Sequence, residues 1–192
     1  MEEKELVLQS IKGDEEAFGL LVKKYKNKVF NMAYSMTQNR ETADDISQDV
    51  FIKTYKALPK FQFKSQFGTW LYQITVNHIR DFLRKESKVK HYSLEEMQEL
   101  PSPDKNHTHS VEKIQIDKKR REIVHTTIRA LPEKHRIILV LRDIQGYSYD
   151  DIAKILKISP GTVDSRLFRA RRSLRKKISP FLNQIGGNHA MP

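Results

Sequence analysis

The spacing of apolar residues constrains the fold of this chain more than any other feature of its sequence. Phe, Leu, Ile and Val recur three and four residues apart in both halves, as they do on one face of an α-helix. We find no convincing alternation of the kind that a half-buried strand shows. The sequence therefore predicts an all-α protein, with helices over 3–11, 14–37, 41–57, 69–85, 111–130, 132–144, 149–156 and 160–178.

Charge is distributed unevenly along the chain. The net charge is +11, with +4 in residues 1–90, −3 in residues 91–110 and +10 in residues 111–192. The acidic middle segment carries Pro101 and Pro103 and little apolar periodicity, as a solvated linker does. We expect two small helical domains, 1–90 and 113–192, joined by a flexible linker over 91–112.

Several classes of protein are excluded by what the sequence lacks. The chain has no cysteine, which excludes disulfides, thiolate metal sites and cysteine nucleophiles. It shows no signal peptide, no membrane-spanning run, no Gly-rich phosphate loop and no nucleophile elbow. We expect a cytoplasmic protein that is not an enzyme and takes no cofactor, metal or small-molecule substrate. A net charge of +11 suits a polyanionic partner instead.

The second half carries the signals of two short helices with a tight joint. Gly146 ends one helix, and Ser148 with Asp151 forms a start like a capping box. Ser159 is a good N-cap, and Pro160 falls at the first helical position, where its missing N–H has no consequence. This pattern is typical of a helix-turn-helix over about 149–172.

The helix that starts at Pro160 has one apolar stripe and one cationic face. At about 100° per residue, the stripe contains Val163, Leu167, Ala170, Leu174 and Ile178. Seven basic residues and no acid follow Asp164. A solvated basic helix end is the simpler interpretation, but the preceding helix pair favours DNA binding in the major groove. The candidate contacts are Thr162, Ser165, Arg166, Arg169 and Arg172.

The helix over about 41–58 has the opposite charge on its exposed side. It is expected to bury Ala43, Ile46, Val50, Thr54 and Leu58. An acidic face with an apolar residue in its middle suits a protein partner better than DNA. The candidate docking residues are Asp44, Asp45, Gln48, Asp49 and Ile52. There are two alternatives to a docking surface: an ordinary solvated face, or a metal site on Asp45 and Asp49.

The helix over about 69–85 carries amides and guanidiniums along one stripe, which can contact bases and phosphates. The loop before it interleaves cations with aromatic residues, a composition suited to stacking unpaired bases. We expect Phe61, Phe67 and Trp70 to be structural. The candidate contacts are Gln73, Asn77, Arg80 and Arg84 on the helix and Lys60, Phe63 and Lys64 in the loop.

Four motifs in this order resemble the bacterial sigma-70 family, and within it the extracytoplasmic-function (ECF) sigma factors. They are DDISQDVF at 44–51, FGTWLYQITVN at 67–77, LPE at 131–133 and SPGTVDSRLFRAR at 159–171. The resemblance implies a region 2 domain and a region 4 domain, in a factor that directs core RNA polymerase to promoters of a stress or envelope-response regulon.

The resemblance also implies roles for the candidate residues. The acidic helix would dock on the clamp helices of the largest polymerase subunit, and region 4 would contact the flap of the second-largest subunit. The helix over 69–85 and its loop would read the unwound minus-ten element, and the helix-turn-helix would read the minus-thirty-five element. An anti-sigma factor is the implied regulator. Asp164 stands where many relatives carry a basic residue, which predicts an altered base preference.

Two other functions remain open at the level of sequence. A helix-turn-helix regulator acting alone would bind palindromic DNA as a dimer. A nuclease using Asp44, Asp45 and Asp49 would require magnesium. His107 and His109 could bind a metal, although a polar linker more often holds histidines without function.

Overall fold

The computed structural model describes residues 2–92, 124 and 126–185, with side chains described for 2–87, 124 and 126–180. Within these ranges every element is helical, which confirms the predicted all-α fold. The elements are α1 (Glu3–Ile11), α2 (Glu15–Thr37), α3 (Arg40–Ala57), the 3₁₀ turn η1 (Leu58–Lys60), α4 (Phe67–Tyr92), α6 (Glu133–Leu139), the π-helical turn η2 (Val140–Ile144), α7 (Tyr149–Leu156) and α8 (Pro160–Ile185).

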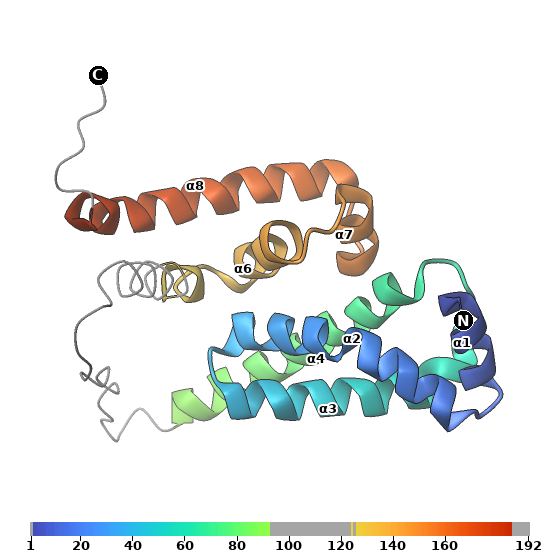
Figure 1. Cartoon of the computed structure of the whole chain (residues 1–192). Helices are drawn as coiled ribbons and strands as arrows, with labels where there is room; N and C mark the ends of the chain where they lie inside the picture. Colours follow the sequence, from blue (N-terminus) through green and yellow to red (C-terminus); the bar gives the residue numbers. More distant parts are fainter. Residues whose placement is uncertain (1, 93–123, 125, 186–192) are drawn as a thin grey trace, which may run out of the picture.

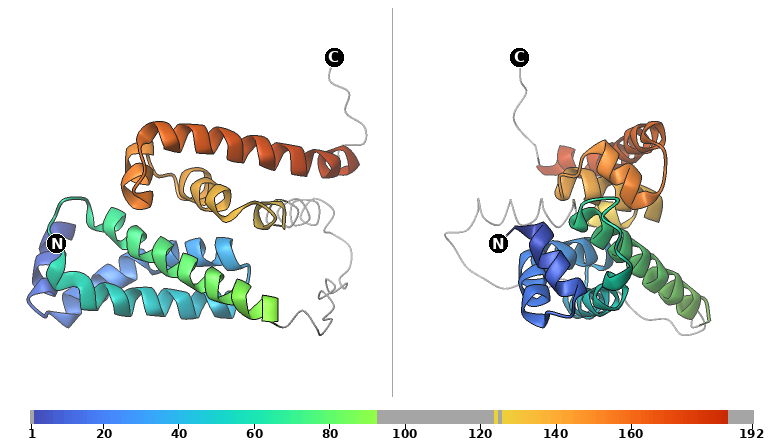
Figure 2. Two further views of the ribbon diagram at one scale, coloured as in Figure 1. Left: turned by 180° about the vertical axis from the view of Figure 1, so that it is seen from behind. Right: turned by 90° about the vertical axis from the view of Figure 1, so that its right-hand side faces the viewer.

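The helices form two layers that lie against each other (Figure 1). Helices α1 to α4 make the first layer, in which α2 packs on α1 and α3 and also contacts α4. Helices α6 to α8 make the second, in which α8 packs on both α6 and α7. The layers meet mainly where α7 contacts α4, and both views in Figure 2 show α7 above the first half of α4.

Local capping decides where several helices begin. Asp14 accepts a hydrogen bond from the Ala17 N–H at 3.0 Å and is therefore the N-cap of α2. The helix predicted from residue 14 begins one residue later, at Glu15. Asn39 caps α3 in the same way, accepting from the Thr42 N–H at 2.9 Å. Ser148 and Ser159 both accept from the N–H three residues later, as predicted for α7 and α8.

Three predicted helices differ from the observed ones. The helix expected over 69–85 runs from Phe67 to Tyr92, and the last helix continues through Pro180 to Ile185, because a proline removes one backbone donor without necessarily ending a helix. The helix expected over 132–144 divides into α6 and η2, in which the Gln145 N–H donates to the Val140 carbonyl at 2.9 Å. Most of the helix expected over 111–130 lies outside the described residues.

The buried side chains form a continuous apolar cluster that spans both layers. The predicted stripe of α3, which continues into η1, is at most 2% exposed; it contains Ala43, Ile46, Val50, Thr54 and Leu58. In the second layer the core is built from α6, η2 and the two helices of the helix-turn-helix, including Val163, Leu167 and Ala170 as predicted. The apolar stripes thus leave the charged faces of α3 and α8 in solvent.

Candidate functional site

The acidic face of α3 is a hollowed surface beside α2. Asp44, Asp45, Gln48, Asp49 and Ile52 are all exposed, and Ile52 retains 53% of its accessible surface. A groove of about 830 Å³ between α2 and α3 is lined in part by Asp44 and Gln48. A second hollow of about 370 Å³ includes Ile52 beside the rings of Phe18, Phe51 and Tyr55. Three of the five predicted docking residues, Asp44, Gln48 and Ile52, therefore line two concave and partly apolar hollows.

Asp49 has a partner on α4. Its Oδ2 lies 3.2 Å from His78 Nε2, while Lys53 Nζ lies 2.5 Å from His78 Nδ1. This geometry suits a neutral imidazole that donates from Nε2 to Asp49 and accepts at Nδ1 from Lys53. Burial and the Lys53 cation lower the pKa of His78, and Asp49 partly opposes that shift. The link orients the Asp49 carboxylate at the edge of the acidic face.

The loop before α4 is held by an aromatic cluster. Phe61 and Phe67 are buried, and the Phe61 ring lies 4.8 Å from the Trp70 ring, so these residues are structural as expected. Phe63 adopts a positive φ of 55° and is 40% exposed. Lys60 and Lys64 are exposed beside it. The three candidate loop residues therefore lie in solvent around a rigid aromatic base.

Gly68 allows α4 to begin close to α2. A Cβ atom on Gly68 would lie 2.9 Å from the hydroxyl oxygen of Tyr25. That hydroxyl donates to Glu3 Oε2 at 2.8 Å, which ties α1 to the same point. The absence of a side chain at Gly68 thus fixes the position of the loop and of the first turn of α4.

The polar stripe of α4 is divided between solvent and the second layer. The Gln73 amide donates to the Lys154 carbonyl at 3.0 Å, and Arg80 Nε lies 3.1 Å from Glu133 Oε1. Arg84 pairs with Asp81 on its own helix. Asn77 is exposed, and its side chain has no hydrogen bond to any residue that the structure describes. Three of the four predicted minus-ten residues on α4 therefore already have partners within the chain, and two of these partners, Lys154 and Glu133, belong to the second layer.

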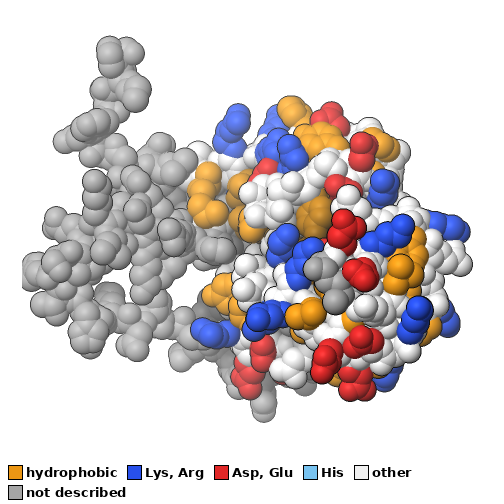
Figure 3. Space-filling view, turned by 45° about the vertical axis from the view of Figure 1, so that its right-hand side comes forward, with side chains coloured by type: hydrophobic (Ala, Val, Ile, Leu, Met, Phe, Trp, Pro, Cys, Tyr) orange, Lys and Arg blue, Asp and Glu red, His pale blue; other side chains and the backbone are white. Residues whose placement is uncertain are grey.

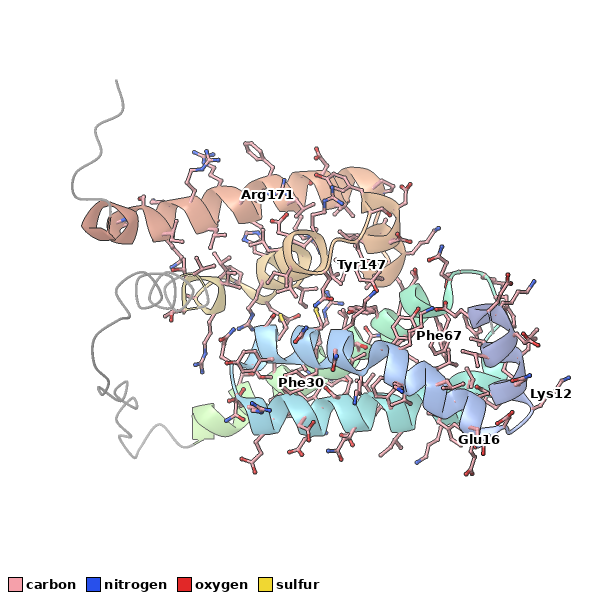
Figure 4. All side chains as sticks on the ribbon, in the orientation of Figure 1. Lys12, Glu16, Phe30, Phe67, Tyr147 and Arg171 are labelled. Atoms are coloured by element: carbon pink, nitrogen blue, oxygen red, sulfur yellow. The ribbon has the colours of Figure 1, made fainter. Side chains whose placement is uncertain are left out.

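Two tyrosines complete the contact between the layers, which we call the closed contact: the pairing of α4 with α6, α7 and the loop that precedes α7. The Tyr72 hydroxyl donates to Gln145 Oε1 at 3.0 Å, and the Tyr72 and Tyr147 rings pack edge to face at 4.8 Å. Burial raises the pKa of Tyr147 to about 12 and also raises that of Tyr72, so both hydroxyls stay protonated at neutral pH. Figure 4 shows Tyr147 where the two layers meet.

The helix-turn-helix presents α8 as predicted. Thr162, Ser165 and Arg166 are partly exposed, while Arg169 and Arg172 are exposed. Arg169 curls back onto its own helix, with Nη2 donating to Ser165 Oγ at 3.2 Å. Burial lowers the pKa of His135 on α6, and the nearby cations Lys134, Arg169 and Arg166 lower it further.

Three side chains near these faces were not predicted as contacts. Phe168 is 67% exposed on α8. Its position outside the apolar stripe of this helix could have predicted that exposure from the sequence. Lys154 and Lys157 of α7 line a hollow of about 440 Å³ together with the loop lysines and Trp70. Nothing local in the sequence predicts that hollow, because it depends on how the layers meet.

Charge is mixed on the face that Figure 3 shows, with basic and acidic side chains interspersed. Among the residues with described positions, no three His, Asp or Glu side chains are placed to hold a metal ion. No helix in the same ranges is long and apolar enough to cross a membrane. His107 and His109 lie outside the described residues.

Comparison with known proteins defines the class of protein. Residues 21–89 match the family described as Sigma-70 region 2, and residues 121–174 match Sigma-70, region 4. Two solved structures share the fold. CnrH in complex with the cytosolic domain of CnrY has a TM-score of 0.69 and 25% identity, over 93% of this chain and 97% of that one. The sigma factor RpoE in complex with the anti-sigma factor NepR from Bartonella quintana has a TM-score of 0.66 and 22% identity, over 84% and 96%.

Curated relatives narrow the assignment to one branch of the family. The RNA polymerase sigma-H factor of Pseudomonas aeruginosa is 34% identical over 187 residues, which cover 95% of this chain and 97% of that protein. The ECF RNA polymerase sigma-E factor of Escherichia coli K12 is 34% identical over 191 residues, covering 93% and 95%. The chain belongs to the sigma-70 family and is an ECF-type sigma factor, a transcription regulator that directs RNA polymerase to promoters.

Proposed function

We propose that three surfaces of this sigma factor divide the work of promoter-directed initiation. The acidic face of α3 docks on the clamp helices of the largest subunit of core RNA polymerase, through Asp44, Asp45, Gln48, Asp49 and Ile52. Exposed carboxylates around a partly apolar hollow suit a basic helical partner, because opposite charge guides the encounter and Ile52 adds apolar contact.

The second surface reads the unwound minus-ten strand. The solvent-exposed loop residues Lys60, Phe63 and Lys64 offer cations and a ring to unpaired bases. Gln73, Asn77, Arg80 and Arg84 continue this surface along α4. Because Gln73 and Arg80 take part in the closed contact, full use of the surface requires the two layers to separate.

The third surface places α8 in the major groove of the minus-thirty-five element, where Thr162, Ser165, Arg166, Arg169 and Arg172 contact bases and phosphates. The same domain contacts the flap of the second-largest subunit. Exposed Phe168 adds an apolar contact suited to a thymine methyl group.

These surfaces belong to a region 2 domain over 1–90 and a region 4 domain over 113–192, with 91–112 as the linker. Catalysis belongs to the polymerase, and the chain itself is not an enzyme. The protein acts in the cytoplasm, where an anti-sigma factor holds it inactive. The observation that carries the proposal is the pairing, in one chain, of an exposed acidic helix with a capped helix-turn-helix whose second helix is cationic.

Run-off transcription with core polymerase on a promoter library tests the proposal. Asp49→Arg should abolish all products by preventing docking, whereas Glu5→Arg makes the same charge change at an exposed position of α1 and should preserve them. Arg166→Ala should relax the choice of upstream element without abolishing transcription. Arg175→Ala removes an exposed arginine further along α8 and serves as its control.

The alternatives predict other results. A dimer on gel filtration that ignores core polymerase would favour a regulator acting alone. Magnesium-dependent DNA cleavage that is lost on changing Asp44, Asp45 and Asp49 would favour a nuclease.

A further inference from the structure

Asp164 is an unpaired acid on an otherwise cationic helix. It is the only Asp or Glu within Pro160–Ile185, and its side chain is exposed. Helical side chains pair three or four residues apart, and at those distances Asp164 has Pro160, Gly161, Leu167 and Phe168, none of them basic. Its side chain makes no hydrogen bond or ion pair with any residue in the described ranges.

Two of the arginines that follow Asp164 on the helix have other partners. Arg171, two turns further on, pairs with Asp143 of η2, with Nη2 2.5 Å from Oδ1. Arg169 turns toward Ser165. The carboxylate of Asp164 therefore has both oxygens available for a partner outside the chain. Asp164 lies in the early part of α8, between the candidate base contacts Thr162 and Ser165 in the sequence.

We propose that Asp164 is a base-reading residue whose carboxylate accepts a hydrogen bond from the N4 amino group of a cytosine in the upstream promoter element. This inference rests on the proposed placement of α8 in the major groove. If charge alone mattered, Asp164 would only weaken DNA binding by repelling phosphates. The proposal instead gives this residue a role in sequence specificity.

The chemistry of the groove restricts what a carboxylate can bind there. Phosphates repel it, and guanine and thymine present acceptor oxygens at their major-groove edges. Adenine has an amino donor, but its N7 acceptor lies next to it, and a carboxylate has no proton to offer N7. Cytosine presents the N4 amino group and no purine N7, so it is the base best matched to Asp164.

A holoenzyme assay can separate base reading from simple charge repulsion. Wild type, Asp164→Ala and Asp164→Asn would each be assembled with core polymerase and bound to a library randomised over the upstream element. The bound DNA would then be sequenced. Asp150→Ala, which removes an exposed acid from α7, is the matched control. Because Asp164 is exposed and outside the apolar stripe, these variants should fold.

Wild type should prefer cytosine at one position by about 5- to 140-fold, the discrimination expected of a good base contact. Asp164→Ala should lose that preference at that position alone, while its binding to unrelated DNA increases because a negative charge is gone. Asp164→Asn should move the preference toward adenine, since an amide can bond both N6 and N7. Asp150→Ala should keep the wild-type preference.

Two results would overturn the inference. If Asp164→Ala strengthens binding to every sequence by the same factor and leaves all base preferences intact, Asp164 only repels phosphate. If the wild-type holoenzyme has no preference anywhere in the upstream element, the proposed function of α8 fails, and this assignment fails with it.

Discussion

Replacing Glu133 with arginine should open the closed contact. Arg80 and Glu133 form an ion pair between α4 and α6, with side chains 32% and 43% exposed. Glu133→Arg puts two guanidinium groups where the pair had opposite charges. Because the change lies in the second layer, the α4 surface proposed to read the minus-ten strand is unaltered.

The expected magnitude follows from this exposure. An ion pair this accessible to solvent contributes about 0.5–1 kcal/mol, and the like-charge pair that replaces it opposes closure by a similar amount. A total of about 1–2 kcal/mol shifts the ratio of open to closed molecules by about 5- to 30-fold. At 1 M salt, where the screening length is about 3 Å, most of the shift should disappear.

Energy transfer between two dyes measures the opening directly. The chain has no cysteine, so cysteines introduced at exposed Lys12, directly after α1, and at exposed Lys176 in α8 give two clean labelling sites. Glu133→Arg should lower the transfer efficiency and tighten the binding of a single-stranded minus-ten oligonucleotide. Asp150→Arg adds the same charge to the same domain without touching the ion pair, and it should leave the transfer efficiency unchanged.

The reasoning would be refuted if both variants strengthened oligonucleotide binding equally and neither changed the energy transfer. In that case the added positive charge alone would explain the binding, and the closed contact would not compete with DNA.

Three further predictions concern stability. Gly68→Ala should destabilise the fold by about 1–3 kcal/mol, because the new methyl group meets a packed tyrosine. Gly19→Ala, at a helical position with no atom within 4 Å, should stabilise it by about 0.5–1 kcal/mol; equal effects in urea denaturation would contradict the close approach. Ser148→Ala removes the cap of α7 and should lower the free energy of unfolding by about 1 kcal/mol, and an unchanged urea midpoint would speak against this cap. The pKa values of His78 and His135 are lowered in the folded state, so the stability that these residues contribute is present above their unfolded pKa of about 6.5 and is lost as the pH falls below it. Denaturation at pH 7.5 and 5.5 should show this loss, and His78→Gln should reduce it; an unchanged pH dependence would count against the proposed cause.

Most of the fold is encoded locally and could be predicted. The caps at Ser148 and Ser159 bond to N–H groups three residues away, so the sequence around each one contains both partners. The buried stripe of α3 follows from helical periodicity alone. The same periodicity placed Asp44 and Arg172 on solvent-exposed faces, although their roles in binding remain predictions.

The contacts between distant elements could not be predicted. Periodicity shows which face of α4 is polar, but it does not show that Gln73 meets Lys154 or that Arg80 meets Glu133, residues 81 and 53 positions away. The π-helical turn was not predicted either, because residues 140–144 have the composition of an ordinary α-helix. The difference lies in one hydrogen bond: the Gln145 N–H donates to the carbonyl of Val140, five residues earlier, instead of to the carbonyl four residues earlier.

The double use of Gln73 and Arg80 restricts how this protein can evolve. Each side chain has one partner inside the folded chain and a second, proposed partner in the promoter. A mutation that changes promoter choice at either position therefore also changes how readily the two layers separate in the free protein. Lineages that acquire new target genes through this helix should show compensating changes at Glu133 or around Lys154, on a domain that never touches those bases.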